Sequence, residues 1–559
     1  MPKPFVHPGI LTLTQAAINE KCFFRIIFIG NPFLNFPFMK YFLLLFPFFL
    51  TQFLHAQTQV PFTVEIQPVI AGPLPGMHSF AFAQSGSKWL FIGGRTNGLH
   101  GFSTNNNFDV LYESDVISVI DTATWSWYSA PLAQLPTAVA DPLRATNAEY
   151  TRIGNYLYIV GGFGWDSTAM GYRTYPKLTA IDINNMIAAV MAGTSIAPDI
   201  RQITDTNLRV CGGEMQNANG ECFLFFGQDF SGRYSDPPQP TFLQTYSNKI
   251  KRFTLTDNGI TVSVSNFTYL TDTTNFHRRD LNLGNVVHAD GSFGWCAYSG
   301  VFRKDYELPY PWPINYDPVN GAQVDSSFSQ QMNNYTCALE PLYDSVRSTM
   351  YTILFGGESE YDFNPANGQL TLDSLVPFVS DISVLVHDTL GHWAQVPLQL
   401  QMPGLQGSNM KFVPVASVPA YSNDVVKLRS LSGRVLAGYL VGGIVSPTPN
   451  LPPTSWANDT VYRVFITPDQ NLLSVNENYF SNSVDVFPNP ANDHVIVRVH
   501  DAGDVRVCMY DAQGKMIRDE KHSGRQDVNF YTGDLAAGVY SIMVETADSI
   551  SREKLIIVR

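Results

Sequence analysis

Charged side chains are scarce in this chain. Lys, Arg, Asp and Glu together make up 15% of the 559 residues, whereas an average soluble protein has roughly a quarter. Apolar residues reach 45%, which excludes intrinsic disorder because disordered chains are poor in apolar residues. The 35 basic residues are outnumbered by 48 acidic ones, giving a net charge of -13. This balance excludes the basic surface that nucleic-acid binding requires and disfavours anionic membrane surfaces as partners.

The sequence also lacks the short motifs of several enzyme classes. It contains no His-Glu-x-x-His zinc site, no Gly-x-Ser-x-Gly nucleophile turn and no phosphate-binding loop. The segment 362–368 is similar to a calcium loop, but Ala366 stands where an oxygen ligand is needed, so a hairpin turn explains it better. We therefore expect no metal and no cofactor.

Long apolar runs are absent as well. The run 41–53 is shorter than the about 20 residues that a transmembrane helix needs. A basic residue precedes this run and a small residue follows it, which is the arrangement of a secretory signal peptide. We expect a signal peptide over 39–56, an upstream mis-start over 1–38 and no transmembrane segment in the mature chain. The alternative is an N-terminal membrane anchor that also uses 22–38, which prolines would interrupt.

Cysteine is rare, with six residues in the chain, so the fold does not depend on a dense disulfide framework. Cys211 and Cys222 flank the turn 216–220, which places them on the two arms of one hairpin. We expect them to face each other and form a disulfide. Two reduced, buried thiols are the alternative.

Glycine (41), proline (36) and aromatic residues (13%) are abundant by contrast, which is typical of many short buried strands between turns. One unit occurs six times: an apolar strand, a turn, a second apolar strand, and then two glycines or a near equivalent. These pairs are Gly93-Gly94, Gly161-Gly162, Gly227-Gln228, Ser299-Gly300, Gly356-Gly357 and Gly442-Gly443. Two more strands follow in each unit. A repeated four-stranded unit predicts the blades of a β-propeller, because stacked blades bury faces that no single small sheet can bury.

The repeat resembles the kelch repeat in its double glycine and in the tryptophan of its outer strands, here Trp127 and Trp393. The resemblance covers 57–478 and implies a six-bladed kelch-type β-propeller with long loops on one face. The third and fourth units depart from the glycine pair, and the sixth lacks the outer tryptophan. We expect the strand 62–66 to close the ring against the last unit, with 472–475 as the competitor. A tandem of β-sandwich domains is the alternative fold.

The fraction of charged residues is higher near the end of the chain. Residues 485–559 include 12 acidic and 9 basic side chains, so more than a quarter of this segment is charged. Alternating strands indicate a small immunoglobulin-like β-sandwich after a linker over 479–484. The segments 488–491, 511–515 and 535–540 resemble the type A C-terminal sorting domain of the bacterial type IX secretion system. The resemblance implies the type IX translocon as a partner and a secreted or outer-surface location. An adhesion-type immunoglobulin-like domain is the alternative.

Functional side chains are expected where the propeller strands approach the axis. The loop that leads into the first strand of a blade and the loop that leaves the second strand open on the same face. Their chemically active side chains include His78, Arg95, Arg144, Arg209, His277, Arg278, Arg279, Glu340 and Glu358. Arginines at equivalent positions predict a cationic funnel for a carboxylate, a sulfate or an acidic sugar, and a buried glutamate is a candidate base. Alternatively, the arginines hold the long loops in place.

Together these features predict an all-β protein that is secreted or displayed on the cell surface and binds a glycan or protein ligand. The sequence identifies no catalytic site. The alternative is an enzyme on the same fold that acts on acidic sugars, similar to the kelch-type sialic acid epimerases. The ligand depends on loop geometry, which no motif encodes.

Overall fold

A computed structural model describes most of the chain from residue 60 to residue 559. The described ranges are 60–69, 74–102, 107–234, 241–288, 290–388, 391–450, 454–474, 484–499, 504–511, 515–523, 527–545 and 550–559. The expected upstream segment, the expected signal peptide and nearly all of the expected linker lie outside these ranges.

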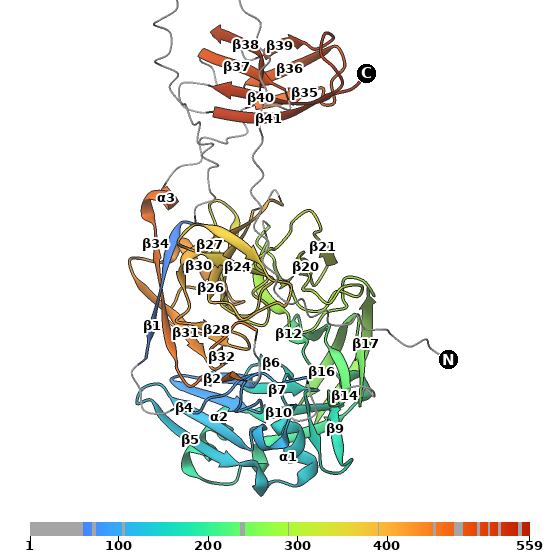
Figure 1. Ribbon diagram of the computed structural model, residues 1–559, viewed down its shortest axis with the longest axis vertical. Coiled ribbons are helices and arrows are strands. Elements are labelled where there is room, and N and C mark those ends of the chain that lie inside the picture. The colour runs from blue at the N-terminus through green and yellow to red at the C-terminus, as the bar shows by residue number, and fades with distance from the viewer. Residues whose placement is uncertain are drawn as a thin grey trace, which may run out of the picture. The chain divides into compact units, whose positions relative to one another are not determined.

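The fold is all-β (Figure 1), and six of its sheets share one plan. In each sheet, four antiparallel strands lie side by side. The first sheet contains β2 (Ala81–Ser85), β3 (Lys88–Ile92), β4 (Val116–Asp121) and β5 (Ser126–Pro131). The second contains β6 (Glu149–Ile153), β7 (Tyr156–Val160), β10 (Lys177–Asp182) and β11 (Ile200–Thr204). The third contains β12 (Glu214–Ala218), β13 (Glu221–Phe225), β16 (Lys249–Asp257) and β17 (Val262–Thr271).

The other three sheets follow the same order, with one addition in the fifth. The fourth contains β18 (Asn282–Val287), β19 (Phe293–Tyr298), β20 (Ile314–Asp317) and β21 (Gly321–Val324). The fifth contains β22 (Ala338–Asp344), β23 (Thr349–Phe355), β26 (Asp381–His387) and β27 (Trp393–Gln401), and β30 (Val426–Lys427) pairs with β22 in parallel. The sixth contains β29 (Lys411–Pro414), β31 (Val435–Val441), β34 (Tyr462–Pro468) and β1 (Phe62–Pro68).

The second strands of the sheets lie deep in the core. All seven residues of β23 are buried, and in β7 and β13 only the first residue is partly exposed. Strands that are covered on both faces read as continuous apolar runs, because neither set of alternate side chains meets water. This explains why the repeat is easiest to see at the second strand.

Backbone hydrogen bonds connect neighbouring sheets and return from the sixth sheet to the first. In five of them the donor is the N–H of the glycine that follows a second strand: Gly94 to Ala145 O (3.0 Å), Gly162 to Val210 O (2.9 Å), Gly227 to Arg278 O (2.9 Å), Gly357 to Gln406 O (3.1 Å) and Gly443 to Met77 O (3.0 Å). The fourth and fifth sheets are joined through Asn282, whose side chain donates to Asn334 O at 2.6 Å and accepts from Cys337 N at 2.9 Å. The six sheets therefore form a closed circuit of contacts.

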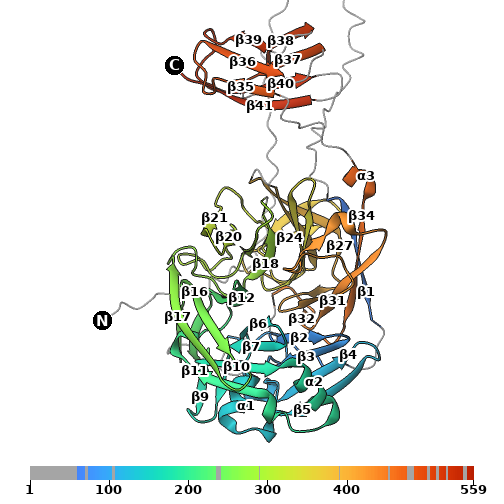
Figure 2. The same ribbon diagram turned by 180° about the vertical axis from the view of Figure 1, so that it is seen from behind.

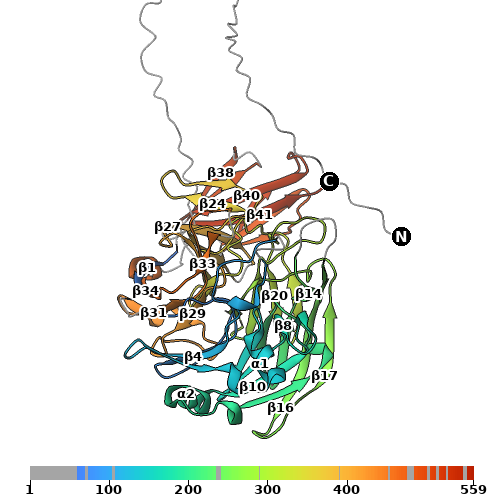
Figure 3. The same ribbon diagram turned by 60° about the horizontal axis from the view of Figure 1, so that its bottom comes forward.

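The strand β1 completes the sixth sheet, as the sequence predicted. All seven of its residues pair with β34 (Figure 3). Phe62 is 3% exposed and its ring packs edge-on against Tyr351 of the fifth sheet at 5.7 Å. Residues 472–474 of the competing segment belong instead to the short helix α3 (Gln470–Ser474). The pairing joins an early strand and a late strand in one sheet.

The glycine pairs lie where neighbouring sheets crowd together. Gly161 has a φ of +68°, and a Cβ at this position would collide with the Val210 carbonyl of the next sheet. In the third and fourth sheets, Phe226 and Ser299 stand one residue before the glycine and keep the same left-handed backbone, with φ values of 57° and 47°. The repeat therefore conserves the turn geometry even where the first glycine is replaced.

Helices are few, and the sequence did not predict them. α2 (Ile183–Ala192) begins at Asp182, whose carboxylate accepts a hydrogen bond from Asn185 N, and ends at Gly193 in the left-handed region. Its apolar face packs against β4 and β5 (Figure 2). Among the described residues of the six-sheet part, the other α-helices are α1 (Thr137–Arg144) and α3. Within the described ranges, no helix has the length and apolar character to cross a membrane.

Loops from several sheets build smaller sheets of their own. The largest combines β8 (Phe163–Asp166) and β9 (Gly171–Thr174) from the second unit with β14 (Gln228–Gly232) and β15 (Phe242–Tyr246) from the third. The smaller ones contain β24 (Tyr361–Asn364) with β25 (Gln369–Leu372), and β28 (Leu405–Gln406) with β32 (Ile444–Ser446) and β33 (Trp456–Ala457). These sheets account for the long spacings between units.

The structure corrects the disulfide prediction. Cys211 and Cys222 are both buried and free. In the register of this hairpin, Cys211 lies opposite Gln228 and Cys222 lies opposite Asn217. The two thiols therefore occupy different levels of the hairpin and cannot reach the Cα separation that a disulfide requires. Burial also raises the pKa of Cys222 to about 12.

The C-terminal segment forms two sheets around a core of its own. One sheet contains β35 (Val484–Phe487), β36 (His494–Val499) and β39 (Asp527–Tyr531). The other contains β38 (Met516–Ser523), β37 (Asp504–Tyr510), β40 (Gly538–Glu545) and β41 (Ile550–Ile557). Side chains from both sheets, such as Val497 and Val507, are fully buried in one cluster. A sandwich with its own core is expected to fold as a separate unit.

Candidate functional site

Six residues with left-handed backbone, one from each unit, precede the first strands of the six sheets. These residues, which we call the belt, are Ser79, Asn147, Gly212, Asp280, Thr336 and Asn409, with φ values between 50° and 69°. Backbone hydrogen bonds join four consecutive pairs of the belt, for example from Asn147 N to Ser79 O at 3.1 Å and from Gly212 N to Asn147 O at 3.0 Å. Five of the six line two cavities at once. The belt therefore separates two pockets, to which all six units contribute.

The first cavity, which we call the arginine pocket, has a volume of about 130 Å³. It contains residues that lie just before the belt and residues that follow the second strands. Pairs of them form isolated β-bridges: His78 with Arg95, Thr146 with Phe163, Cys211 with Gln228, Arg279 with Val301, and Tyr335 with Glu358. Four of the nine predicted site residues line this pocket: His78, Arg95, Arg279 and Glu358.

Arg95 is a buried arginine of this pocket, with 3% of its surface exposed. Its guanidinium donates to Asn97 Oδ1 at 3.1 Å and to Asp109 O at 3.0 Å. Burial lowers its pKa, and the Glu113 carboxylate partly offsets this effect. Arg95 therefore remains a cation that is held in one orientation by its own loop.

Arg279 supplies a second guanidinium. It donates to the Tyr246 hydroxyl, and its Nε lies 3.2 Å from Asp280 Oδ2. Burial alone would lower its pKa, but Tyr246 and Asp280 outweigh burial and raise it. The side chain keeps 11% of its surface exposed. Arg279 is therefore charged, oriented and in reach of a ligand.

His78 and Glu358 are the other two predicted site residues that line the arginine pocket. Burial and the charge of Arg95 lower the pKa of His78 to about 3, so its imidazole is neutral. Its Nδ1 lies 2.9 Å from Ser79 Oγ, whereas its buried Nε2 has no hydrogen-bond partner among the described residues. Such an orphaned polar atom indicates a place for a ligand or water.

Glu358 is a buried carboxyl group with two hydroxyl donors. Tyr335 Oη donates to its Oε2 at 2.9 Å, and Ser408 Oγ donates to its Oε1 at 2.7 Å. Burial raises the pKa of Glu358 to about 7, although the two hydroxyl groups oppose this rise. The group can therefore hold or release a proton near neutral pH.

Aromatic rings form one wall of the arginine pocket. Phe163 and Phe230, which come from the extra sheet β15-β14-β9-β8, lie 5.1 Å apart. Phe108 contacts Phe163 at 4.9 Å and His100 at 4.2 Å. Phe102 is 60% exposed and completes this wall. Flat apolar faces next to fixed cations can bind a ligand with both apolar and anionic parts.

Two predicted arginines lie outside the pocket. Arg144, at the end of α1, pairs with Asp141 at 2.9 Å, and Asp141 also accepts from Ser167 N. Arg209 lies 3.8 Å from Asp229, and both side chains are more than a third exposed. Both arginines hold or border loops, as the alternative interpretation of the sequence expected.

The other three predicted residues also lie away from the arginine pocket. Arg278 is fully buried and donates to the carbonyls of Asn275, Ser299 and Trp312. The His277 ring stacks on Tyr246 at 3.8 Å. Glu340 is 3% exposed, and burial raises its pKa well above the ordinary value.

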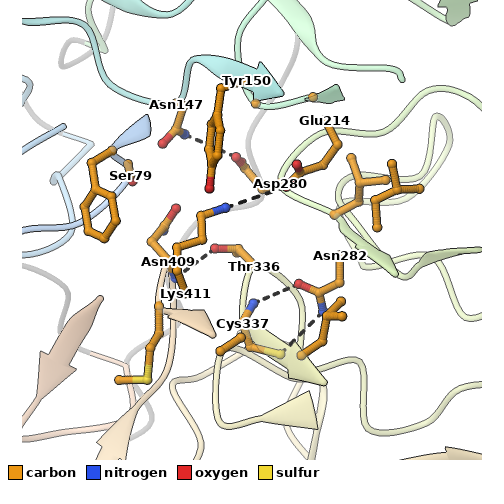
Figure 4. A pocket seen from close by; sticks show the side chains of 18 of the residues that line it. Ser79, Asn147, Tyr150, Glu214, Asp280, Asn282, Thr336, Cys337, Asn409 and Lys411 are labelled. Carbon is orange, nitrogen blue, oxygen red and sulfur yellow. Dashed lines mark hydrogen bonds and ion pairs between the residues drawn. The ribbon is translucent and has the colours of Figure 1, made fainter. Parts of the chain in front are cut away.

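The second cavity, which we call the lysine pocket, lies on the other side of the belt and has a volume of about 220 Å³. Figure 4 shows Lys411 extending into it toward Tyr150 and Glu214. The Lys411 Nζ lies 3.9 Å from Glu214 Oε1 and 5.5 Å from the centre of the Tyr150 ring. The sequence analysis did not select these residues. In the sequence they are distinguished only by an ionic or phenolic side chain two or three residues after a member of the belt.

These observations define an all-β protein whose six similar sheets share two central pockets, followed by a separate β-sandwich. Residues 485–558 match the family described as the secretion system C-terminal sorting domain. Sorting domains of this kind mark proteins that leave the cell through the type IX secretion system. The protein is therefore exported to the outer cell surface or beyond it, and its C-terminal segment is recognised by that system.

The remaining comparisons concern the whole chain. No curated protein matches it. A solved structure described as "Structure of YjhT" is similar with 11% sequence identity and a TM-score of 0.39, covering 70% of this chain and 96% of that chain.

Proposed function

We propose that residues 57–478 form a six-bladed kelch-type β-propeller whose arginine pocket binds a ligand outside the cell. The closed circuit of hydrogen bonds between the six sheets supports the propeller, and so do the pairing of β1 with β34 and the crowded glycine turns. In the same proposal, residues 39–56 are a signal peptide, 1–38 an upstream mis-start, 479–484 a linker and 485–559 an immunoglobulin-like sorting domain.

One observation carries the binding function. Side chains from all six units meet in a pocket that has two fixed guanidinium groups, an aromatic wall and an unpartnered imidazole nitrogen. Guanidinium groups bind carboxylates and sulfates through paired hydrogen bonds, and aromatic faces pack against sugar rings. We infer that the ligand is a glycan with an acidic group. A protein ligand that presents an acidic side chain is the second form of the same proposal.

Binding of the exported protein to an array of acidic and neutral glycans tests this proposal. Arg279→Ala is expected to weaken binding of acidic glycans by roughly tenfold to a hundredfold, because a hydrogen bond to a charged group contributes about 1.5–3 kcal/mol. Arg434→Ala is the matched control. Arg434 also pairs with a carboxylate, Glu65 at 3.0 Å, and also packs on an aromatic ring, but it directly precedes β31 and lies outside the pocket. Equal binding by both variants would refute the proposal.

A second candidate function is catalysis on acidic sugars, such as epimerisation. The observation that favours it is the Glu358 carboxyl group, whose pKa of about 7 suits a group that accepts and returns a proton. Turnover of uronic and sialic acids is the test, and Glu358→Gln is expected to abolish it while retaining ligand binding. Binding without turnover by the native protein supports the binding function instead.

A further inference from the structure

The lysine pocket gathers polar side chains from three different sheets. Lys411 comes from β29, Tyr150 from β6 and Glu214 from β12, and Figure 4 shows their polar ends directed toward the same space. The side chains of Lys411 and Glu214 are 31% and 27% exposed. Because the two groups are 3.9 Å apart and partly exposed, the Lys411 amine can still donate hydrogen bonds to a ligand and the Glu214 carboxylate can still accept them.

The charges in this pocket are balanced. Lys411 faces Glu214, and Asp280 is already paired with Arg279 and accepts from Asn147 Nδ2 at 3.2 Å. Burial alone would lower the pKa of Lys411, but Tyr150 and Glu214 outweigh it and raise the pKa, so the amine stays protonated. A ligand of either net charge would leave one member of an ion pair opposed by a like charge. The pocket therefore favours a neutral ligand.

The size and lining of the pocket narrow the ligand further. Drug-sized ligands occupy pockets of roughly 300–1,000 Å³, so about 220 Å³ admits one small molecule. The lining combines hydroxyl and amide groups of the belt, such as Thr336 and Asn409, with the aromatic face of Tyr150. Many donors and acceptors next to one aromatic face match a molecule with several hydroxyl groups and an apolar face.

We propose that the lysine pocket is a second binding site, which holds one neutral sugar unit. Lys411 donates to ring or hydroxyl oxygens, Glu214 accepts from hydroxyl groups, and the Tyr150 ring packs against the sugar. This site is separated by the belt from the arginine pocket, and the proposal stands whether or not that pocket binds an acidic glycan. The sugar is either a free monosaccharide or the end of a glycan chain.

Calorimetric titration of the full-length protein tests the site. The probes are methyl hexosides, oligosaccharides that end in the same hexoses, and the corresponding uronic acids. Lys411→Met is expected to weaken binding of the neutral sugar at least about tenfold. Lys249→Met is the matched control, because Lys249 Nζ also lies over a tyrosine ring, that of Tyr269 at 5.1 Å, but outside both pockets. Lys249→Met is not expected to change this binding.

Glu214→Gln provides a second variant that keeps the size of the side chain, and heat unfolding shows whether each variant is folded. Glu214→Gln is expected to weaken binding of the neutral sugar as well, because one acceptor oxygen becomes an amide donor. Binding of methyl hexosides identifies a site for free sugar, whereas binding of only the oligosaccharides identifies a site for chain ends. Absence of any neutral-sugar binding, preference for the uronic acids, or equal affinity in Lys411→Met and the native protein would overturn the proposal.

Discussion

Arg278 and Arg279 are neighbours in the sequence but have different roles. Arg278 is fully buried, donates to loop carbonyls and lies 4.0 Å over the Tyr310 ring. Arg279 forms a β-bridge with Val301 and directs its side chain to the arginine pocket. Successive side chains of an extended segment point to opposite sides. One arginine therefore supports a loop while the next faces the arginine pocket.

The buried carboxyl group of Glu358 leads to a prediction about pH. Its pKa rises from an ordinary value of 4.5 to about 7 in the folded protein. Between these values the folded state binds more protons than the unfolded state, so this group makes stability fall as pH rises from 4.5 to 7. Glu358→Gln removes this loss. We compare the free energy of unfolding of the variant with that of the native protein. This difference is expected to be up to about 3 kcal/mol more favourable to the variant at pH 8 than at pH 5.

Heat unfolding at pH 5 and pH 8 measures this difference. Glu307→Gln is the control, because Glu307 is exposed and its substitution is expected to change the two midpoints equally. If Glu358→Gln shifts the unfolding midpoint by the same amount at both pH values, the carboxyl group does not titrate as described.

At the scale of elements, the turns after the second strands govern how closely the sheets approach. Gly161→Ala is expected to destabilise the protein by roughly 3 kcal/mol. An alanine with left-handed backbone costs about 1–2 kcal/mol, and the collision of its Cβ with the Val210 carbonyl adds to this cost. Gly154→Ala shares the left-handed φ, +60°, but has open space around the Cβ. It should cost only about 1 kcal/mol. Urea unfolding of the two variants compares them, and equal costs would show that the crowding is unimportant.

The strand β1 gives a second prediction at this scale. Phe62 is buried against the fifth and sixth sheets, whereas Thr63 is exposed on the other side of the same strand. Phe62→Ala is expected to cost about 3–5 kcal/mol, and Thr63→Ala less than about 0.5 kcal/mol. Denaturant unfolding provides the measurement. A small effect of Phe62→Ala would mean that β1 does not hold the sixth sheet in place.

At the scale of the whole molecule, the C-terminal sandwich is separate in core and in role. Its buried side chains form one cluster of residues from 484 to 557, and residues 485–558 match the sorting domain family. The six sheets have clusters of their own. Export and ligand binding are therefore expected to depend on different parts of the chain.

Removal of residues 485–559 tests this separation. The shortened protein is expected to remain in the periplasm, because the type IX system no longer recognises it, while its six-sheet part unfolds at an unchanged temperature. Immunoblots of medium, cell surface and periplasm, together with heat unfolding, measure both effects. Export of the shortened protein at the native level would contradict the assignment of the sorting function.

Much of the strand pattern was predictable from local sequence. The second strands and their glycine turns could be recognised because burial on both faces produces continuous apolar runs. The helix α2 was not predicted, because its apolar residues lie in a connection between two strands and find their partners only in the folded chain, chiefly on strands of the first sheet such as β4 and β5. The prediction of a disulfide was wrong, because the register of a hairpin, rather than the spacing of its cysteines, decides which residues face each other.

By itself, the sequence determined the all-β character, the repeated four-stranded unit, the closing strand β1 and the exported location, because each depends on local pattern or on a segment with its own core. The tertiary structure decided which charged residues share a pocket. Arg95, Arg279 and Glu358 come together, whereas Arg144, Arg209 and Arg278 support loops, and Lys411 meets Glu214 in the lysine pocket. These contacts join residues far apart in the chain, and only the packing of the six sheets against one another fixes their distances.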